Sequence, residues 1–225
     1  MLEAKKNVLF EKIFIAYNRI LIKRRFQSIK VSGLEWLKKR NPDLPLIIFS
    51  NHSSWWDGLV ILELLSNFNF ENYVMMEEKQ LRKLRFFRRL GAFSIIRENP
   101  REAFKSIEYS VKILSEKKNR MLLIFPQGKI LHNDASPMRF FNGLSKIIEE
   151  SGVCLVCPIA LRYEFLGNYK PEIFIAVGEP RKFNTVDKIA RKRNTLELEA
   201  VLTNCLNHLK SNLVNSEFDN FEQIL

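Results

Sequence analysis

The chain has 225 residues, 46% of them hydrophobic, which is enough for one sizeable core and short for two. Lys and Arg number 36 against 25 Asp and Glu, and the formal net charge of +11 favours an anionic partner: nucleic acid, a membrane surface or acidic small molecules. Three cysteines exclude a disulfide framework, and because no signal-peptide pattern opens the chain we expect a reducing, cytosolic setting.

The first predicted element is an amphipathic helix within residues 1–26. Glu11, Lys12 and Arg19 interrupt its apolar content, so the segment is too polar to span a membrane. Its apolar positions recur with helical spacing and basic residues flank them, a pattern that allows the helix either to lie on a bilayer or to pack on the core. The predicted apolar face consists of Leu9, Phe10, Ile13, Phe14, Tyr17, Ile20 and Leu21.

From residue 27 onward, short strand-like runs alternate with longer segments of helical periodicity, which predicts an α/β fold with a mixed, mainly parallel central sheet flanked by helices. We expect one domain over 27–214 and an acidic C-terminal tail, 215–225, that frays. The expected strands are 29–33, 45–50, 72–76, 92–96, 121–126, 153–161 and 172–178. The expected helices are 57–67, 78–90, 100–117, 137–150 and about 185–214.

The stretch "NHSSWWDG" follows the second of these strands, at the edge where open α/β sheets usually place their ligands. Asp57 would begin the next helix, so its carboxylate could fold back and orient the imidazole of His52, leaving the other ring nitrogen as a base. The alternative is a capping aspartate beside a hydrogen-bonded loop histidine. The pair alone does not choose between these interpretations.

Three further stretches place special residues near the ends of other strands. "GAFSIIR" ends on Arg97, which suits a phosphate contact. "LLIFPQGK" is an apolar strand followed by a polar turn with a glycine, and would bring a second loop to the same edge. "VCPIAL" contains Pro158, which predicts an edge strand, a bulge or a strand end.

In order and approximate spacing, "NHSSWWD", "GAFSIIR", "FPQG" and "VCPIA" resemble the four motif blocks of the lysophospholipid and 1-acylglycerol-3-phosphate acyltransferases. The resemblance covers about residues 28–180, and its specific part is the combination of His-x4-Asp with Phe-Pro-x-Gly. It implies transfer of a fatty acyl group from acyl-CoA or acyl carrier protein to a hydroxyl of a lysophospholipid, without a metal or a redox cofactor.

The resemblance also implies roles for individual residues. His52 would be the general base towards the acceptor hydroxyl, and Asp57 would orient it. Arg97 would bind the acceptor's phosphate. The turn Phe125, Pro126, Gln127, Gly128 and Lys129 would bind the acceptor, and the motif-shaping residues would be Asn51, Ser54, Gly91 and Pro158.

The third block departs from the pattern of the phospholipid-making members. There the motif reads Phe-Pro-Glu-Gly followed by a small hydroxyl residue and arginine, whereas this chain has Gln127, and Lys129-Ile130 follow the glycine. A lysine offers phosphate a point charge but not the bidentate grip of a guanidinium. The expected acceptor is 1-acylglycerol 3-phosphate, with a neutral or glycosylated lipid alcohol as the alternative.

A basic stretch with interleaved apolar residues lies between the first two blocks. Anionic lipid headgroups or the acyl donor would suit it, so we expect a peripheral protein on the cytoplasmic face of the membrane. A nucleic-acid binder or a non-catalytic lipid-binding protein is the rival; because no nucleic-acid motif accompanies the stretch, we expect no nucleic-acid partner. The patch consists of Lys79, Arg82, Lys83, Arg85, Arg88 and Arg89.

The cysteines raise the possibility of a zinc site, because Cys154-x-x-Cys157 and Cys205-x-x-His208 supply four ligands. The first pair falls in an expected strand, where residues three apart point to opposite faces. We therefore expect no metal, and interpret the cysteines as core residues.

Overall fold

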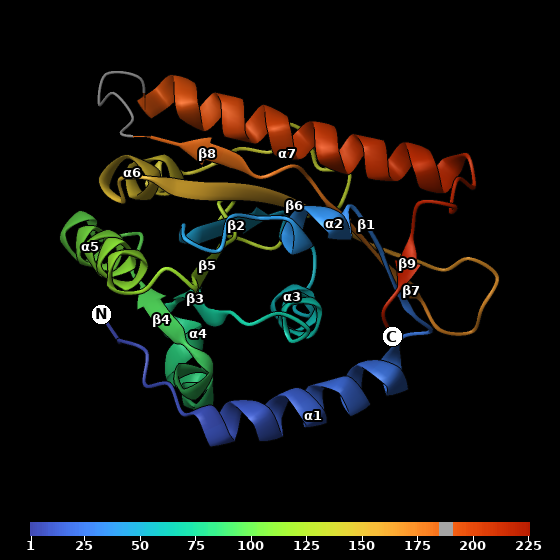
Figure 1. Cartoon of the computed structure of the whole chain (residues 1–225), viewed down its shortest axis with the longest axis horizontal. Helices are drawn as coiled ribbons and strands as arrows, with labels where there is room; N and C mark the ends of the chain where they lie inside the picture. The colour runs from blue at the N-terminus through green and yellow to red at the C-terminus, as the bar shows by residue number, and fades with distance from the viewer. Residues whose placement is uncertain (185–190) are drawn as a thin grey trace.

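A computed structural model of the chain describes residues 1–184 and 191–225 (Figure 1). In the described residues the strands form one sheet in the order β4-β3-β5-β2-β6-β7-β1-β9, with β8 paired to β6. The strands are β1 (Ile29–Ser32), β2 (Leu46–Ser50), β3 (Glu71–Glu77), β4 (Ala92–Ile95), β5 (Arg120–Ile124), β6 (Cys154–Glu164), β7 (Glu172–Val177), β8 (Arg181–Phe183) and β9 (Glu222–Gln223).

Helices cover both faces of this sheet. Figure 1 shows α5, α6 and α7 on one side and α1 and α3 on the other. The helices are α1 (Val8–Arg25), α2 (Leu34–Lys38), α3 (Asp57–Leu65), α4 (Glu78–Lys83), the 3-10 helix η1 (Arg85–Leu90), α5 (Pro100–Glu116), α6 (Gly143–Glu150) and α7 (Arg191–Val214).

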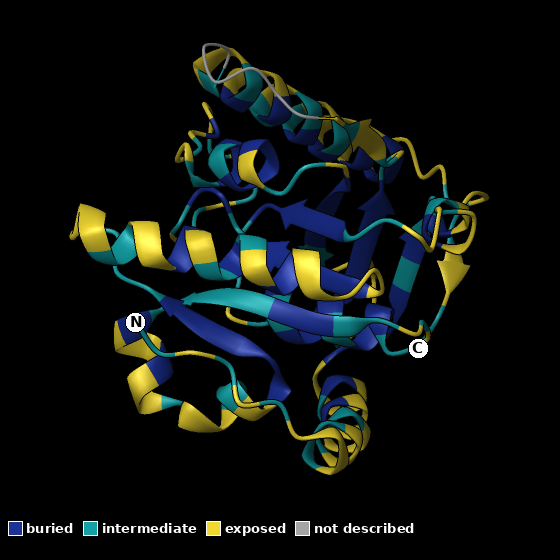
Figure 2. Cartoon of the chain, turned by 60° about the vertical axis from the view of Figure 1, so that its left-hand side comes forward, coloured by how far each residue is buried: buried dark blue, intermediate teal, exposed yellow. Residues whose placement is uncertain are grey.

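The two faces of the sheet carry two separate hydrophobic cores because successive strand side chains point to opposite sides. In β2, Ile47 and Phe49 pack beneath α5, α6 and α7, whereas Leu46 and Ile48 pack beneath α1, α2 and α3. Figure 2 shows buried strands in the middle of the molecule and exposed residues on the outer sides of helices. A strand buried on both faces is the reason β2 is a continuous apolar run.

Most strand pairs are parallel, which confirms the predicted mixed, mainly parallel α/β fold. The parallel pairs are β4–β3, β3–β5, β5–β2, β2–β6 and β7–β1, and the antiparallel pairs are β6–β7, β6–β8 and β1–β9. Since β2, β5 and β4 run in one direction, the loops that follow them emerge at the same edge.

Pro158 lies inside β6, a central strand between β2 and β7, so the prediction of an edge, bulge or strand end was wrong. On one side β6 pairs with β8 through Val156 and then with β7 from Ile159 onward. The Pro158 carbonyl accepts the Gly178 N–H on that same side. Because the N–H and C=O of a strand residue point the same way, the missing N–H falls in the gap between β8 and β7.

Three other expectations need correction. The helix expected over 78–90 breaks at Leu84 into α4 and η1, because the backbone there leaves the helical region (φ −114°, ψ 55°). The helix expected from residue 137 begins at Gly143. The tail was expected to fray, but β9 pairs with β1, and Phe218 and Phe221 pack against the Phe174 ring.

Helix α2 and strand β8 were not predicted from the sequence. Residues 185–190, the beginning of the helix expected over 185–214, lie outside the described residues. No helix in the described parts of the chain combines the length and apolar character needed to cross a membrane.

The N-terminal helix α1 is held against α3 by polar contacts. Asn7 caps it by accepting the Phe10 N–H. The buried Asn18 donates to the Leu59 carbonyl of α3 at 3.0 Å, and Arg19 pairs with Glu63 at 2.7 Å. The predicted apolar face does not act as one surface: part of it is half-buried, and Leu9, Ile13, Tyr17 and Ile20 are 55–69% exposed.

Candidate active site

The loop that joins β2 to α3 brings His52 and Asp57 together. His52 Nδ1 lies 2.7 Å from Asp57 Oδ2. The same oxygen accepts the backbone N–H groups of Ser53 at 2.7 Å and Ser54 at 2.9 Å, and with Nδ1–H as the third donor all three contacts are made to one carboxylate oxygen. Nε2 of His52 is then the ring nitrogen with a free lone pair.

Asp57 is completely buried, yet its carboxylate is well satisfied. Oδ1 accepts a hydrogen bond from the Tyr163 hydroxyl at 2.6 Å, in addition to the contacts of Oδ2. Asp57 is also the first residue of α3, where the positive end of the helix dipole stabilises an anion. Several hydrogen bonds to the charged form are what a buried carboxylate needs in order to stay ionised.

The Phe-Pro-Gln-Gly turn after β5 lies directly against the histidine. The Gln127 side-chain oxygen accepts the His52 backbone N–H at 2.7 Å, and the Leu131 N–H donates to the His52 carbonyl at 2.9 Å. The Phe125 ring stacks on the imidazole with centroids 4.3 Å apart. The first and third sequence blocks therefore form one unit, with the histidine side chain 23% exposed.

The second block joins the same unit through Arg97. Its guanidinium donates to the Gly128 carbonyl and lies 5.7 Å from the Phe141 ring. Gly128 has φ +68°, and its N–H closes the turn by donating to the Phe125 carbonyl. A Cβ at this position would collide with Arg97 and Phe141, so the glycine is needed for the close approach. Lys129 follows on the surface.

The predicted motif-shaping residues act at different places. Asn51 clamps β6, since its side chain donates to the Leu161 carbonyl and accepts the Leu161 N–H. Ser54 accepts the Trp56 N–H with its hydroxyl. Gly91 has φ +99° and packs against the Asn72 carbonyl at the amino end of β4, the opposite end of that strand from Arg97.

Tyr163 is the residue at this site that sequence reasoning missed. It lies on β6 five positions after Pro158, and burial, followed by the charge of Asp57, raises its pKa well above the usual value. The sequence contained one signal for it: β6 carries the fourth block, pairs with β2 and therefore runs past the loop that carries His52.

A cavity of about 420 Å³ lies between the β2–α3 loop, which carries His52, and the C-terminal end of α1. Ser54, Trp56 and Tyr163 line it from the loop side, and Leu21 and Arg25 line it from α1. Trp56 packs edge-on against Phe26, with ring centroids 5.2 Å apart, while Trp55 is 53% exposed. The lining is mainly apolar and aromatic, with one cation.

The six basic residues between β3 and β4 fall into two groups: three contact other parts of the protein, and three are exposed. Arg82 pairs with Glu78, Arg88 donates to the Glu3 carbonyl, and the Arg89 guanidinium lies 5.3 Å from the Phe10 ring. These three arginines thus hold the protein together as well as carrying charge. The remaining members, Lys79, Lys83 and Arg85, are exposed.

The cysteines are buried or half-buried core residues. Cys154 and Cys157 belong to the cores on opposite faces of the sheet. Burial raises the pKa of Cys154 to about 12 and that of Cys205 to about 11, so both thiols stay protonated, whereas metals bind the thiolate. In residues 1–184 and 191–225, no three His, Cys, Asp or Glu side chains are grouped to hold a metal ion.

The model of the Acyltransferase family matches residues 28–162, more than half of the chain, from just before β1 to near the end of β6. This range contains all four sequence blocks and both members of the His52–Asp57 pair. No curated protein matches the chain. The chain is a member of the Acyltransferase family, and its activity is acyl transfer.

Proposed function

We propose that this protein transfers a fatty acyl group from an acyl thioester, acyl-CoA or acyl carrier protein, to a hydroxyl of a lysophospholipid such as 1-acylglycerol 3-phosphate. The observation that carries the proposal is the 2.7 Å contact between His52 Nδ1 and the fully buried carboxylate of Asp57. It leaves Nε2 as a base beside a turn from the family's third block. No nucleophilic side chain is needed, because the acceptor supplies the attacking oxygen.

The chemistry follows from this geometry. Nε2 of His52 takes the proton of the acceptor hydroxyl as its oxygen attacks the thioester carbonyl carbon. Asp57 stabilises the imidazolium that forms. When the tetrahedral intermediate collapses, the carbon–sulfur bond breaks and the imidazolium returns its proton to the leaving thiolate, giving an ester and a free thiol. Written in this way, the reaction uses neither a metal nor a redox cofactor.

The cations near the turn support a phosphorylated acceptor. Arg97 gives one N–H to the Gly128 carbonyl, out of the five that a guanidinium carries, and Lys129 is exposed on the same turn. The replacement of glutamate by Gln127 in the motif says little about which acceptor is bound. Its oxygen holds the His52 backbone, a contact that a glutamate carboxylate would also make.

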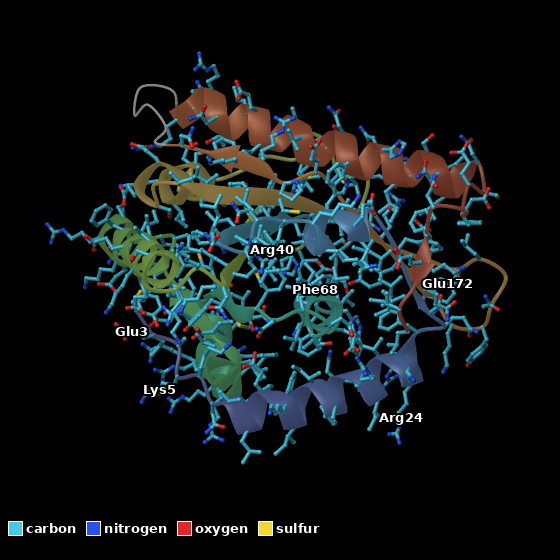
Figure 3. The ribbon with its side chains drawn as sticks, viewed as in Figure 1. Glu3, Lys5, Arg24, Arg40, Phe68 and Glu172 are labelled. Atoms are coloured by element: carbon cyan, nitrogen blue, oxygen red, sulfur yellow. The ribbon has the colours of Figure 1, made fainter. Side chains whose placement is uncertain are left out.

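The outer face of α1 supports a membrane surface as the place of reaction. The exposed side chains of Leu9, Ile13 and Tyr17 point away from α3, and basic residues close the helix. Figure 3 shows one of them, Arg24, extending away from the body of the protein. This combination suits a helix lying in the interface of an anionic bilayer, on the cytoplasmic face in our proposal.

The test is an assay of purified protein with acyl-CoA and acyl carrier protein donors against acceptors with and without phosphate, following thiol release and identifying products by mass spectrometry. His52→Ala should lower kcat about 10²- to 10⁴-fold, the usual contribution of a general base. His208→Ala is the matched control, because His208 is exposed on α7. Equal turnover of wild type and His52→Ala under saturating donor would sink the assignment.

The acceptor panel decides the finer proposal. Acylation of lysophospholipids alone would support the phosphate contact with Arg97 and Lys129. Acylation of neutral or glycosylated alcohols alone would replace the proposed acceptor while leaving the His52 chemistry in place. Silence across the panel would favour a non-catalytic lipid-binding protein.

A further inference from the structure

Strand β6 holds the catalytic loop at two points. Its Leu161 backbone is clamped by the Asn51 side chain, and two residues later Tyr163 donates to Asp57 Oδ1 at 2.6 Å. The first contact is made by the backbone of β6 and the second by one of its side chains. The strand thus grips both ends of the segment that carries His52.

We propose that Tyr163 is a positioning residue of the acyl transfer reaction, fixing the Asp57 carboxylate so that Oδ2 faces His52; this inference rests on the proposed function. The family pattern does not extend to this residue: the matched region ends at Arg162 and the fourth block ends before it.

The carboxylate needs such a partner on its second oxygen. Oδ2 takes three hydrogen bonds from the His52 loop, and Tyr163 is the partner on the opposite side, at a residue with no exposed surface. Without the hydroxyl, Oδ1 would be left buried and unsatisfied, so the carboxylate would rotate or admit water.

The position of Tyr163 is itself fixed by its strand and by ring packing, so it can hold the Asp57 carboxylate. It lies in the β6–β7 ladder opposite Ile173, and its ring packs on Phe26 with centroids 5.7 Å apart. Burial and the neighbouring Asp57 raise its pKa, so the hydroxyl stays protonated across the physiological range and remains a donor. Its hydroxyl contacts Asp57, so we expect its effect on the reaction to be exerted through the carboxylate.

The first experiment is Tyr163→Phe, which removes the hydroxyl and keeps the ring. We expect kcat to fall about 10- to 100-fold with KM nearly unchanged, the usual size of effect for a partner that orients a functional ligand. Tyr169→Phe is the matched control, since Tyr169 is 99% exposed on the loop after β6.

Two further measurements separate positioning from mere folding. In an Asp57→Asn background, Tyr163→Phe should have no additional effect, because residues that act as a unit are not additive. Nitrogen-15 NMR of the histidines, of which the chain has three, reports the tautomer without any substrate. Wild type should hold His52 as the Nδ1–H tautomer, and Tyr163→Phe should mix the tautomers.

The outcomes distinguish this inference from the proposed function. If acyl transfer depends on His52 but Tyr163→Phe keeps the wild-type kcat and the wild-type histidine spectrum, the positioning role is wrong. If the tautomer is disturbed by Tyr163→Phe while no acyl transfer is found in wild type, the positioning stands and the proposed reaction fails.

Discussion

The β2–α3 loop, which carries His52, and helix α1 differ in where they place polar and apolar groups. In the loop, a fully buried Asp57 is surrounded by donors and the His52 backbone is fixed on both sides by the turn after β5. In α1 the arrangement is inverted: polar Asn18 faces the protein, while Leu9 and Ile13 face outward with 69% and 60% of their surface exposed. Chemistry needs atoms fixed away from water, whereas contact with lipid needs apolar groups left outside.

Helix α1 does not need its exposed apolar side chains to stay in place, because an ion pair, a core residue and ring contacts on its inner face hold it. Arg19 pairs with Glu63, whose side chain is 2% exposed, and Ile22 belongs to the core below. Phe14 adds ring contacts with Phe86 and Phe87 of η1. The outer apolar side chains therefore contribute little to folding, and are available for a bilayer.

The largest expected effect that would sharpen this comparison is a loss of lipid binding, without a loss of stability, when the exposed apolar side chains of α1 are replaced. We expect Leu9→Gln with Ile13→Gln to weaken binding to anionic vesicles about 10²- to 10⁴-fold, because each buried apolar side chain is worth roughly 1.5–3 kcal/mol when fully inserted. Vesicle co-sedimentation measures the binding, and thermal unfolding should be unchanged since both positions are exposed.

The matched control is Leu196→Gln, at a 57%-exposed leucine on α7. Equal vesicle binding by the α1 double variant and wild type would remove the outer face of α1 from the membrane proposal. A drop in unfolding temperature would show instead that these residues stabilise the fold.

A smaller effect should arise in the loop alone. Gln127→Met keeps the size of a side chain that is 4% exposed, but removes the acceptor of the His52 N–H. We expect roughly 10-fold lower kcat, from a buried donor left unsatisfied, with vesicle binding unchanged. Gln127→Glu should stay close to wild type, because a carboxylate oxygen accepts the same bond. Loss of activity in Gln127→Glu as large as that in Gln127→Met would contradict this explanation.

The sequence predicted the loop far better than it predicted α1. Buried strands such as β2 are continuous apolar runs, and the residues that follow them at the sheet edge were identifiable from the blocks around His52, Arg97 and Gly128. Helix α1 was correctly placed, but apolar spacing alone does not say which side faces the protein, and here Asn18 and Arg19 decide it by finding partners on α3.

The remaining errors have a common physical cause, which is tertiary pairing between distant segments. Pro158 is tolerated in a central strand because β6 changes partners around it. The acidic tail is ordered because β9 adds to β1, 191 positions or more earlier in the chain. Tyr163 gains its role from Asp57, which is 106 positions away. Local periodicity and turn chemistry contain no record of such partners.

The smallest expected effect concerns Glu78, the first residue of α4, whose carboxylate lies 3.6 Å from the amino group of Met1. Burial by itself raises the pKa of Glu78, but hydrogen bonds from Ser94 and Arg82 outweigh it, and the pKa in the folded protein is lowered. A lowered folded pKa gives stability that is present above the unfolded value of 4.5 and is lost as the pH falls through the folded value.

We therefore expect Glu78→Gln to lower Tm at pH 7 by about 2–4 °C, the shift that one paired carboxylate would cause in a chain of this size. The difference from wild type should shrink as the pH falls from about 5, because wild-type Glu78 then takes up a proton and becomes as neutral as glutamine. Thermal unfolding of both proteins from pH 7 to pH 3 measures it. A Tm difference that stays constant over this range would mean that the carboxylate acts through packing rather than charge, and that the basic stretch is held in place without the Arg82 ion pair.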